Sequence, residues 1–427
     1  MNKNIKLAVA GAVLALSATA NAGIIIPAGD WTLDINGNVN GFMSSTRADS
    51  PTGTHSSGTY VNGGRAYEGQ NNASGVATGD NARRQLGLTT GLLPAWIGFT
   101  GKTRQNDLDV EFTISLQPQM SDNGITGDGA TYHSSTSQFL NRQTYLSFGD
   151  KSWGSIKIGK DLGIFASDAI LNDMTLLGVG SGGSISGSGD NTTLGRIGTG
   201  YIYAAWKGQV AYTTPNFNGF QATIGLTNPN QIGTEQTLAV GTNGLNQDRY
   251  GVEGKASYSF AANDVTGKVW ASGATYDVTT TAYHGTNVTT TTASVGDVGA
   301  NLNVAGFGLT GYYYNGKGAG TTFLGLLGVD TAGNKRDSDG GYVQLTYVLP
   351  TKTKLGASYG ESNLDRAAAD AATTTLVKTN KSYTVGAYHP LTKHLNLVAE
   401  YTNTEAKAHG GNQAESDTYS AGAILFF

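Results

Sequence analysis

Apolar and polar side chains alternate with a period of two along much of the chain. Near its start, Trp31 and Leu33 share one parity and Asp34 lies on the other, and the same alternation returns in residues 107–117 and 249–260. Such a pattern predicts β-strands with one apolar face. Over the whole chain it predicts sixteen strands, at 31–42, 94–102, 107–117, 141–149, 153–160, 206–214, 219–227, 249–260, 265–276, 295–304, 306–315, 341–349, 354–360, 382–389, 394–404 and 417–427.

The connections between these strands are alternately long and short. The long ones fall at 43–93, 118–140, 161–205, 228–248, 277–294, 316–340, 361–381 and 405–416. In an up-and-down sheet, alternate connections lie at opposite ends, so all the long loops share one end. Bacterial outer-membrane barrels combine an even strand number with long external loops and short periplasmic turns, and their closure pairs every backbone polar group. The sequence therefore predicts an all-β fold, a transmembrane antiparallel barrel of sixteen strands.

The composition supports a β-rich chain and excludes several other classes. Gly makes up 62 of 427 residues, and each Gly costs a helix interior about 1 kcal/mol relative to Ala. Because the chain has no Cys, disulfide scaffolds, zinc ribbons and thiol enzymes are excluded. The formal charge of −4 is small and has the wrong sign for a nucleic-acid-binding protein.

Both ends of the chain carry features of an exported barrel. Two lysines precede an apolar stretch at 7–16 and an A-x-A sequence at 20–22, which predicts a signal peptide at 1–22. The apolar stretch is shorter than the about 20 residues that a membrane helix needs. The rest of the chain, 23–427, is then a single barrel domain. Its terminal Phe427 lies on the apolar parity, as expected for a last strand that closes the barrel.

Short motifs are distributed over most of the mature chain. They are TPNFNGF at 214–220, GSIKIGK at 154–160, NRQTY at 141–145, GFTG at 98–101 followed by DL at 107–108, and LPTKTKL at 349–355. These stretches resemble motifs of the Gram-negative general porins. Residues 214–220 resemble the S-P-N-F-x-G-F turn, 154–160 the G-S-V-R-x-G-R strand and 141–145 the S-R-Q-A-Y strand of that family. Residues 98–108 resemble its G-F-x-G…D-L hairpin, and 349–355 its L-S-K-R-T-x-L turn. That family is the trimeric, sixteen-stranded type found in beta- and gammaproteobacteria.

The resemblance implies a homotrimer in the lipid of the cell outer membrane, inserted by the barrel insertion machinery through its C-terminal strand. It implies a water-filled channel for passive diffusion of ions and small hydrophilic solutes, and not an enzyme. In this family the third loop folds into the lumen and narrows it, so residues 161–205 are the expected constriction loop.

The resemblance also implies opposite charges across the constriction. The expected acidic residues of the loop are Asp161, Asp168, Asp173 and Asp190, and the expected wall residues are Lys157, Lys160, Arg142 and Glu111. Lys157 has the inward parity of its strand, opposite Ile156 and Ile158, and Glu111 has the inward parity of its own strand, opposite Val110 and Phe112. Arg142 shares the parity of apolar residues and is placed inward by the resemblance alone. The alternative for each charge is that it only solvates a wet lumen.

Two other functions stay open from the sequence. A substrate-specific channel, such as a sugar or organic-anion porin, would carry an aromatic track in the lumen. Trp96, Trp270, Tyr312 and Tyr314 have inward parity but do not form an obvious ladder. A β-rich surface adhesin would lack the regular short turns and the terminal Phe427.

Motifs for other chemistry are weak. The G-x-G-x-x-G match at 178–183 has no strand–turn–helix unit around it, and no H-E-x-x-H motif accompanies His389 and His394. The acidic run at 330–339 lacks the spacing of a calcium-binding EF-hand loop. The sequence thus predicts no catalytic, cofactor or metal site.

Overall fold

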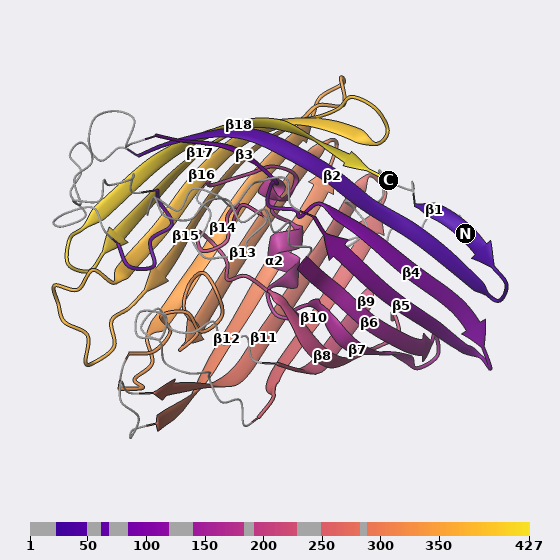
Figure 1. The fold of residues 1–427 in the computed structure, drawn as a ribbon, viewed down its shortest axis with the longest axis horizontal. Helices are drawn as coiled ribbons and strands as arrows, with labels where there is room; N and C mark the ends of the chain where they lie inside the picture. Colours follow the sequence, from indigo (N-terminus) through magenta and orange to yellow (C-terminus); the bar gives the residue numbers. More distant parts are fainter. Residues whose placement is uncertain are drawn as a thin grey trace, which may run out of the picture.

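Eighteen β-strands and two short helices form the regular structure of the described chain (Figure 1). The computed structural model describes residues 23–48, 61–67, 84–118, 140–182, 192–228, 249–281, 288–330 and 332–427. The strands are β1 (Ile24–Ala28), β2 (Trp31–Ala48), β3 (Arg84–Thr89), β4 (Trp96–Gln105), β5 (Leu108–Gln117), β6 (Leu140–Asp150), β7 (Gly154–Leu162), β8 (Trp206–Thr213), β9 (Phe220–Thr227), β10 (Gly251–Ala262), β11 (Val265–Thr281), β12 (Val288–Val304), β13 (Phe307–Lys317), β14 (Asp337–Val348), β15 (Lys354–Leu364), β16 (Val377–Pro390), β17 (Leu395–Ala408) and β18 (Gln413–Phe426). The helices, α2 (Ser167–Leu171) and the 3₁₀ helix η2 (Met174–Leu177), lie between β7 and β8. No helix in the described part of the chain is long and apolar enough to cross a bilayer.

Pairing between successive strands closes the sheet into a barrel. Each strand from β4 to β18 pairs antiparallel with the next. β18 returns to pair with β2, and β2 pairs with β4. The closed ring therefore contains sixteen of the eighteen strands, which confirms the predicted barrel. All sixteen predicted strands are present.

The two strands outside the ring, β1 and β3, lengthen existing strand positions. β1 pairs with residues 31–35 of β2, next to Gly37. Gly37 and Phe427 exchange backbone hydrogen bonds at 2.8 and 3.0 Å, so β1 continues the line in which β18 ends. β3 pairs with residues 42–47 of β2, on the same edge of β2 on which β4 pairs with residues 32–38. Neither strand was predicted, because segments of five and six residues are too short to establish a period.

The wall of the barrel is apolar outside and polar inside. Along β13, Leu309 and Tyr313 are 48% and 50% exposed, whereas Thr310 and Tyr312 are 1% and 6% exposed. Asn380 on β16 is fully buried, although amides are rarely buried in soluble proteins. An apolar exterior around a polar interior is the arrangement of a barrel in lipid. The predicted facing of the wall is confirmed, except at Arg142, which is described below.

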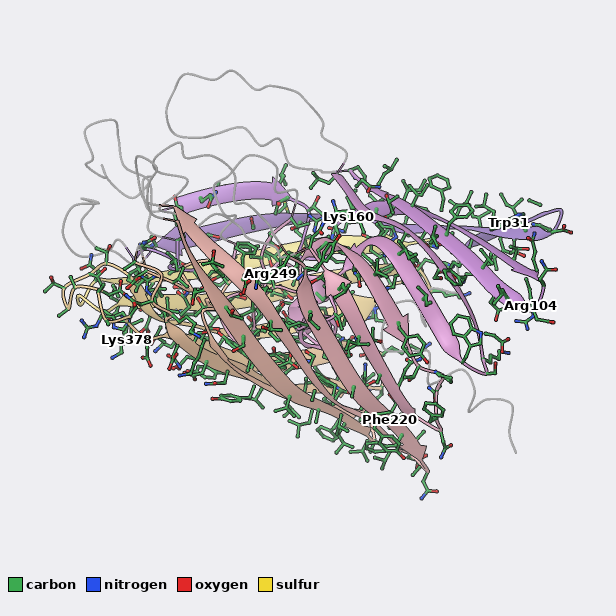
Figure 2. The ribbon with its side chains drawn as sticks, turned by 90° about the horizontal axis from the view of Figure 1, so that it is seen from below. Trp31, Arg104, Lys160, Phe220, Arg249 and Lys378 are labelled. Atoms are coloured by element: carbon green, nitrogen blue, oxygen red, sulfur yellow. The ribbon has the colours of Figure 1, made fainter. Side chains whose placement is uncertain are left out.

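Aromatic side chains lie at both limits of this apolar surface. Trp31 and Phe220 lie at the short-turn end (Figure 2). At the long-loop end the ring of Tyr401 lies 5.8 Å from Tyr383 and 4.9 Å from Tyr419. Amphipathic rings favour the boundary between hydrocarbon and water. The two groups therefore mark the borders of the membrane-facing band.

Several strands continue beyond their predicted limits at the long-loop end. β2 ends at Ala48, β12 begins at Val288 and β16 begins at Val377. Outward positions in this region are polar; for example, Lys381 and Glu405 pair at 2.9 Å. Backbone pairing thus continues above the apolar band, where alternation of apolar and polar residues no longer marks it.

Candidate pore constriction

The described parts of the connection between β7 and β8, residues 163–182 and 192–205, fold into the barrel; we refer to this connection as the third loop (Figure 1). The hydroxyl of Tyr342 on β14 donates a hydrogen bond to the carbonyl of Ala169 at 2.8 Å. Its apolar side chains form one buried cluster with inward-facing aromatic residues of the wall. This cluster includes Phe165, Ile170, Leu176, Ile197, Tyr201, Ile202, Trp270, Tyr276, Tyr312, Tyr314 and Tyr342. The third loop is therefore a packed element of the lumen.

Glu253 of β10 holds the first residues of the third loop. Its Oε2 accepts hydrogen bonds from the backbone N–H groups of Ile164 at 2.8 Å and Phe165 at 2.9 Å. Its Oε1 pairs with Lys207 Nζ at 2.6 Å, and the two side chains are only 3% and 1% exposed. Hydrogen bonds to an ionised group are about twice as strong as neutral ones. The base of the third loop is therefore fixed to the wall by a buried ion pair.

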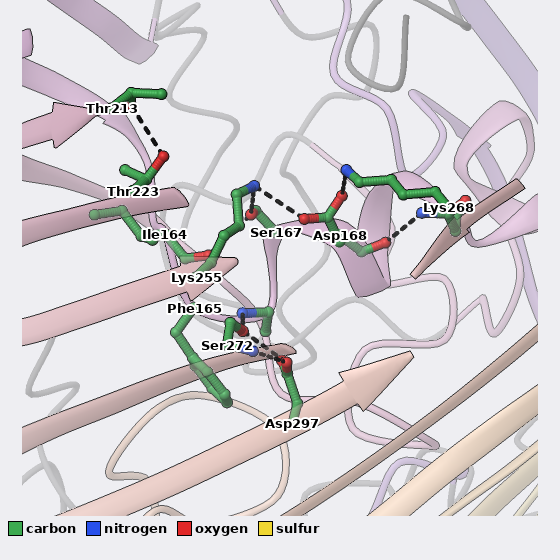
Figure 3. A network of polar contacts seen from close by, with 12 residues as sticks. Ile164, Phe165, Ser167, Asp168, Thr213, Thr223, Lys255, Lys268, Ser272 and Asp297 are labelled. Carbon is green, nitrogen blue, oxygen red and sulfur yellow. Dashed lines mark hydrogen bonds and ion pairs between the residues drawn. The ribbon is translucent and has the colours of Figure 1, made fainter. Parts of the chain in front are cut away.

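Asp168 on helix α2 lies between two lysines of the wall (Figure 3). Its Oδ2 is 3.0 Å from Lys255 Nζ on β10, and its Oδ1 forms an ion pair with Lys268 on β11. Lys255 also donates a hydrogen bond to Ser167 Oγ at 2.8 Å. Burial by itself would raise the pKa of Asp168, but the two ammonium groups outweigh burial and lower that pKa below its usual value. Asp168 is therefore ionised at neutral pH and carries one negative charge against two positive charges.

A second carboxylate, Asp297 of β12, lies beside this group (Figure 3). It accepts hydrogen bonds from Ser272 N at 2.8 Å, Ser272 Oγ at 2.7 Å and the Tyr312 hydroxyl at 3.0 Å. Ser272 Oγ in turn accepts a hydrogen bond from the backbone of Ala166 at 3.2 Å. Ser272 thus connects the third loop to this carboxylate.

The far end of the third loop is held by Glu400 of β17. Its Oε2 accepts hydrogen bonds from the backbone N–H groups of Val179 and Gly180, both at 2.8 Å. Its Oε1 accepts a hydrogen bond from the Tyr388 hydroxyl at 2.7 Å. β10 and β17 are seven positions apart in the ring of sixteen. The third loop therefore crosses the lumen between Glu253 and Glu400.

Asp173 has a different role from the predicted one. Its Oδ1 accepts a hydrogen bond from Thr175 N at 2.9 Å, which caps η2. Its Oδ2 accepts hydrogen bonds from Thr175 Oγ1 at 2.7 Å and the Tyr201 hydroxyl at 2.9 Å. Its carboxylate therefore stabilises the third loop internally, and within the described residues no basic side chain pairs with it. Asp190 lies outside the described residues.

Lys157 and Glu111 both face inward on the wall formed by β4 to β7. Lys157 pairs with Asp161 on its own strand, and its Nζ lies 5.1 Å from the centroid of the Tyr145 ring. The Tyr145 hydroxyl donates a hydrogen bond to Glu111 at 3.3 Å, and Glu111 lies 3.5 Å from Lys102. Asp161 belongs to β7, so its assignment to the loop was wrong.

Arg142 and Lys160 depart from the predicted arrangement in opposite ways. A register shift opposite Ser115 leaves Arg142 as the extra residue of a β-bulge, and its Nη1 donates a hydrogen bond to the Tyr203 hydroxyl of the third loop at 3.3 Å. A bulge redirects side chains, which explains how Arg142 reaches the lumen against its parity. Lys160 is exposed on the outward parity of its strand and donates a hydrogen bond to the Asn141 carbonyl at 2.8 Å. It does not face the third loop, so its place among the inward wall residues is corrected.

The partners of the third loop were missed from the sequence. They are Lys207, Glu253, Lys255, Lys268 and Glu400. Their positions on the polar parity of their strands are visible in the sequence. Parity shows that a side chain faces inward, but it does not show which residue of a distant loop it contacts.

In the described part of the chain, the four inward aromatic residues named from the sequence do not form an open track. Trp270, Tyr312 and Tyr314 are 3%, 6% and 0% exposed because the third loop covers them. Trp96 packs against a separate cluster near Phe42. The side chains that were considered for an aromatic track therefore pack against the third loop.

The acidic run at 330–339 stabilises its own turn. Asp330 Oδ1 accepts hydrogen bonds from the backbone of Ala332 at 2.9 Å and Asn334 at 2.8 Å. Across the described ranges, no three His, Cys, Asp or Glu side chains gather as metal ligands would.

Comparison with known proteins identifies the family. A family model described as Gram-negative porin matches residues 7–409. The outer membrane channel DcaP of Acinetobacter baumannii is 15% identical and has a TM-score of 0.60, covering 94% of this chain and 99% of that chain. OmpT of Vibrio cholerae is 14% identical with a TM-score of 0.53, covering 95% and 100%. OmpF of Salmonella typhi is 13% identical with a TM-score of 0.50, also covering 95% and 100%. No curated protein sequence matches the chain.

At such low identities the structural neighbours establish the fold, whereas the family model covers most of the chain. The chain belongs to the Gram-negative porin family and forms a sixteen-stranded channel for passive diffusion of small solutes across the outer membrane.

Proposed function

We propose that the third loop is the constriction of this channel and limits the size of the ions and hydrophilic solutes that pass. The observation that carries this proposal is the crossing of the lumen between Glu253 on β10 and Glu400 on β17. A barrel of sixteen strands is too wide for its own side chains to fill. An element anchored at both sides of such a lumen reduces its cross-section. Transport follows the concentration gradient, and no step requires catalysis.

We infer that the charges of the constriction lie on two parts of the wall. Asp168, Lys255 and Lys268 form one group, with an excess of one positive charge. The second group lies on the wall formed by β4 to β7, where Lys157 pairs with Asp161 and Glu111 pairs with Lys102. Arg142, on the same wall, donates a hydrogen bond to the third loop. Fixed charges in a narrow pore select ions by sign.

Replacing Asp168 by Asn is expected to shift selectivity toward anions, because it leaves Lys255 and Lys268 without their counter-charge. Reversal potentials across a salt gradient measure the shift. It should be largest below about 0.1 M salt, where the screening length exceeds about 10 Å. The pKa of Asp168 is lowered, so its carboxylate is ionised and its ion pairs are present at any pH above the ordinary pKa of aspartate. These ion pairs are lost only when the pH falls through the lowered pKa. The parental selectivity should therefore hold into mildly acidic solution.

The matched control is Asp107→Asn, which removes the same charge at a fully exposed position in a short turn. It should leave the reversal potential unchanged. Equal shifts in the two variants would mean that Asp168 does not act locally at the constriction.

We also propose a homotrimer that associates through the outer surface of β2, β3 and β15 to β18. One similar structure, of OmpT from Vibrio cholerae, is described as a trimer form. On this chain the surface holds a shallow groove of about 790 Å³, lined by small and apolar side chains that include Met43, Leu86, Ala387, Ala399 and Ala421. Small residues let two membrane-embedded surfaces approach closely.

Ala399→Trp is expected to convert trimers to monomers on native gels, because an indole has no room between two closely packed surfaces. Ala271→Trp is the control, since Ala271 is also exposed but lies on β11, away from the groove. Trimers in both variants would exclude this groove from the interface.

The remaining proposals concern export and assembly. We propose that residues 1–22 are removed as a signal peptide and that the insertion machinery recognises the last strand, which ends at Phe427. Phe427 already joins the closing strand pair through its hydrogen bonds to Gly37. Surrounding lipid then contacts the outward face.

A further inference from the structure

A short segment of the connection between β2 and β3, which we call the first loop, lies inside the long-loop end of the barrel; it comprises residues 61–67. Asn380 of β16, fully buried and inward-facing, binds it twice. Arg65 N donates a hydrogen bond to Asn380 Oδ1, and Asn380 Nδ2 donates one to the Gly63 carbonyl, both at 2.9 Å. Tyr67 N donates a hydrogen bond to Ser416 Oγ of β18 at 3.0 Å. The segment is therefore attached to the inner wall at two strands.

The same segment is also packed against other loops. Asn62 pairs with the backbone of Thr375 and Val377 through two hydrogen bonds of 2.9 Å. Val61 and Ala66 are 3% and 7% exposed. They belong to a buried apolar cluster that also contains Leu327, Leu364, Leu376, Val377, Ala406, Ala408 and Ala414. This part of the first loop is thus as well packed as the third loop.

Arg65 connects the segment to the third loop. Its Nε donates a hydrogen bond to the Ile197 carbonyl at 2.9 Å, and its Nη2 donates one to Ser181 Oγ at 3.0 Å. Ser181 Oγ donates in turn to the Gly195 carbonyl at 2.8 Å. The Arg65 side chain is buried, and burial lowers its pKa to about 10, so it is still charged at neutral pH. One guanidinium thus bridges two separate parts of the third loop.

The next link runs from the third loop to the wall. Arg196, 1% exposed, donates hydrogen bonds from Nη1 to the carbonyl and hydroxyl oxygens of Ser382 on β16, both at 3.1 Å. Within the described residues, neither Arg65 nor Arg196 has a carboxylate within 4.0 Å. Both guanidinium groups are therefore held by neutral acceptors. Because the planar guanidinium reaches several acceptors at once, lysine is a poor replacement in such a position.

We propose that residues 61–67 are a second inward-folded element of the constriction and that Arg65 is the positioning residue that clamps it to the third loop. The channel is then narrowed by two loops that hold each other, and the position of the third loop depends on the first. This inference rests on the proposed role of the third loop in conduction, but the clamp itself can be measured without conduction.

The first test uses chemical labelling, which is clean because the chain has no Cys. Ala66→Cys places a single thiol at a buried position of the segment, and Ala368→Cys places one at an exposed position of a neighbouring loop. A membrane-impermeant maleimide should label Cys at 368 rapidly and Cys at 66 slowly. Adding Arg65→Gln should raise the labelling rate at 66 by about tenfold or more, as expected from the strength of hydrogen bonds to a charged group. It should leave labelling at 368 unchanged.

The second test uses conduction and separates the clamp from the charge. Arg65→Lys keeps the charge but loses the fork of hydrogen bonds, and Arg65→Gln loses both. Both variants should raise unitary conductance and current noise, whereas only Arg65→Gln should also shift the reversal potential toward cations. Arg366→Gln, which removes an exposed arginine from a neighbouring loop, should change none of these quantities.

Labelling at 66 that stays slow in the Arg65→Gln background would overturn the clamp. Faster labelling with parental conductance would keep the clamp but overturn its place in the constriction. If the Asp168 variant also kept parental selectivity, the proposed function of the third loop would fail as well.

Discussion

A lysine in place of Ile158 is expected to reduce the free energy of unfolding by about 2–4 kcal/mol, the cost of a cation on the lipid face near the bilayer midplane. Ile158 is 42% exposed on β7 and lies between outward Leu146 and Val210 on the two adjacent strands. Urea titration in lipid vesicles, followed by the shift in gel mobility between folded and unfolded barrel, measures the loss. The natural Lys157 is the preceding residue on the same strand and faces inward. A lysine at 158 therefore differs from it mainly in pointing toward the lipid.

The control is Glu111→Lys, which introduces the same side chain at an inward position that contacts Lys102 and Tyr145. It should fold like the parent and change conduction instead, because its charge enters the wet lumen. Similar destabilisation by both variants would show that the two faces of the wall do not differ as the burial pattern indicates.

Replacing Glu253 by Ala is expected to cost about 3–5 kcal/mol, because it leaves Lys207 buried without its counter-ion. It also removes the acceptor of the Ile164 and Phe165 backbone N–H groups, so the base of the third loop loses its attachment. Unitary conductance should rise and become noisier in planar bilayers. Denaturant titration of the same variant measures the loss in the free energy of unfolding.

The double variant Glu253→Ala with Lys207→Ala separates these two effects. Removing both charges should recover much of the stability, since no unpaired ion remains buried, but it should not restore the attachment of the third loop. Conductance should therefore stay raised while the unfolding free energy recovers. Parental conductance in both variants would mean that Glu253 does not position the third loop.

The strand number and the facing of the wall were predictable from the sequence. Lipid outside and water inside select side chains of opposite polarity at successive positions, so the period of two records the direction of each residue. Lys157 and Glu111 were placed inward for that reason. The same signal fails above the membrane, where β12 and β16 continue through polar residues.

The constriction was predictable only in outline. Resemblance to the porins indicated which loop folds inward, and Asp168, one of the acidic residues named from it, lies between two basic residues of the wall. Its partners were not predicted, because Lys255 and Lys268 lie nearly a hundred residues away along the chain. Asp173 was misassigned, because its carboxylate is satisfied within two residues of its own position and beside Tyr201.

The sequence by itself determined a closed antiparallel barrel, its two faces and the long-loop end, because each of these depends on local alternation and on connection length. The tertiary structure alone decided which charges meet. The bulge that turns Arg142 inward, the outward direction of Lys160 and the bridge from Arg65 to the third loop all depend on register and on loop packing. Such contacts join segments far apart along the chain. Their energies arise only when the closed barrel brings those segments together in a lumen of limited width.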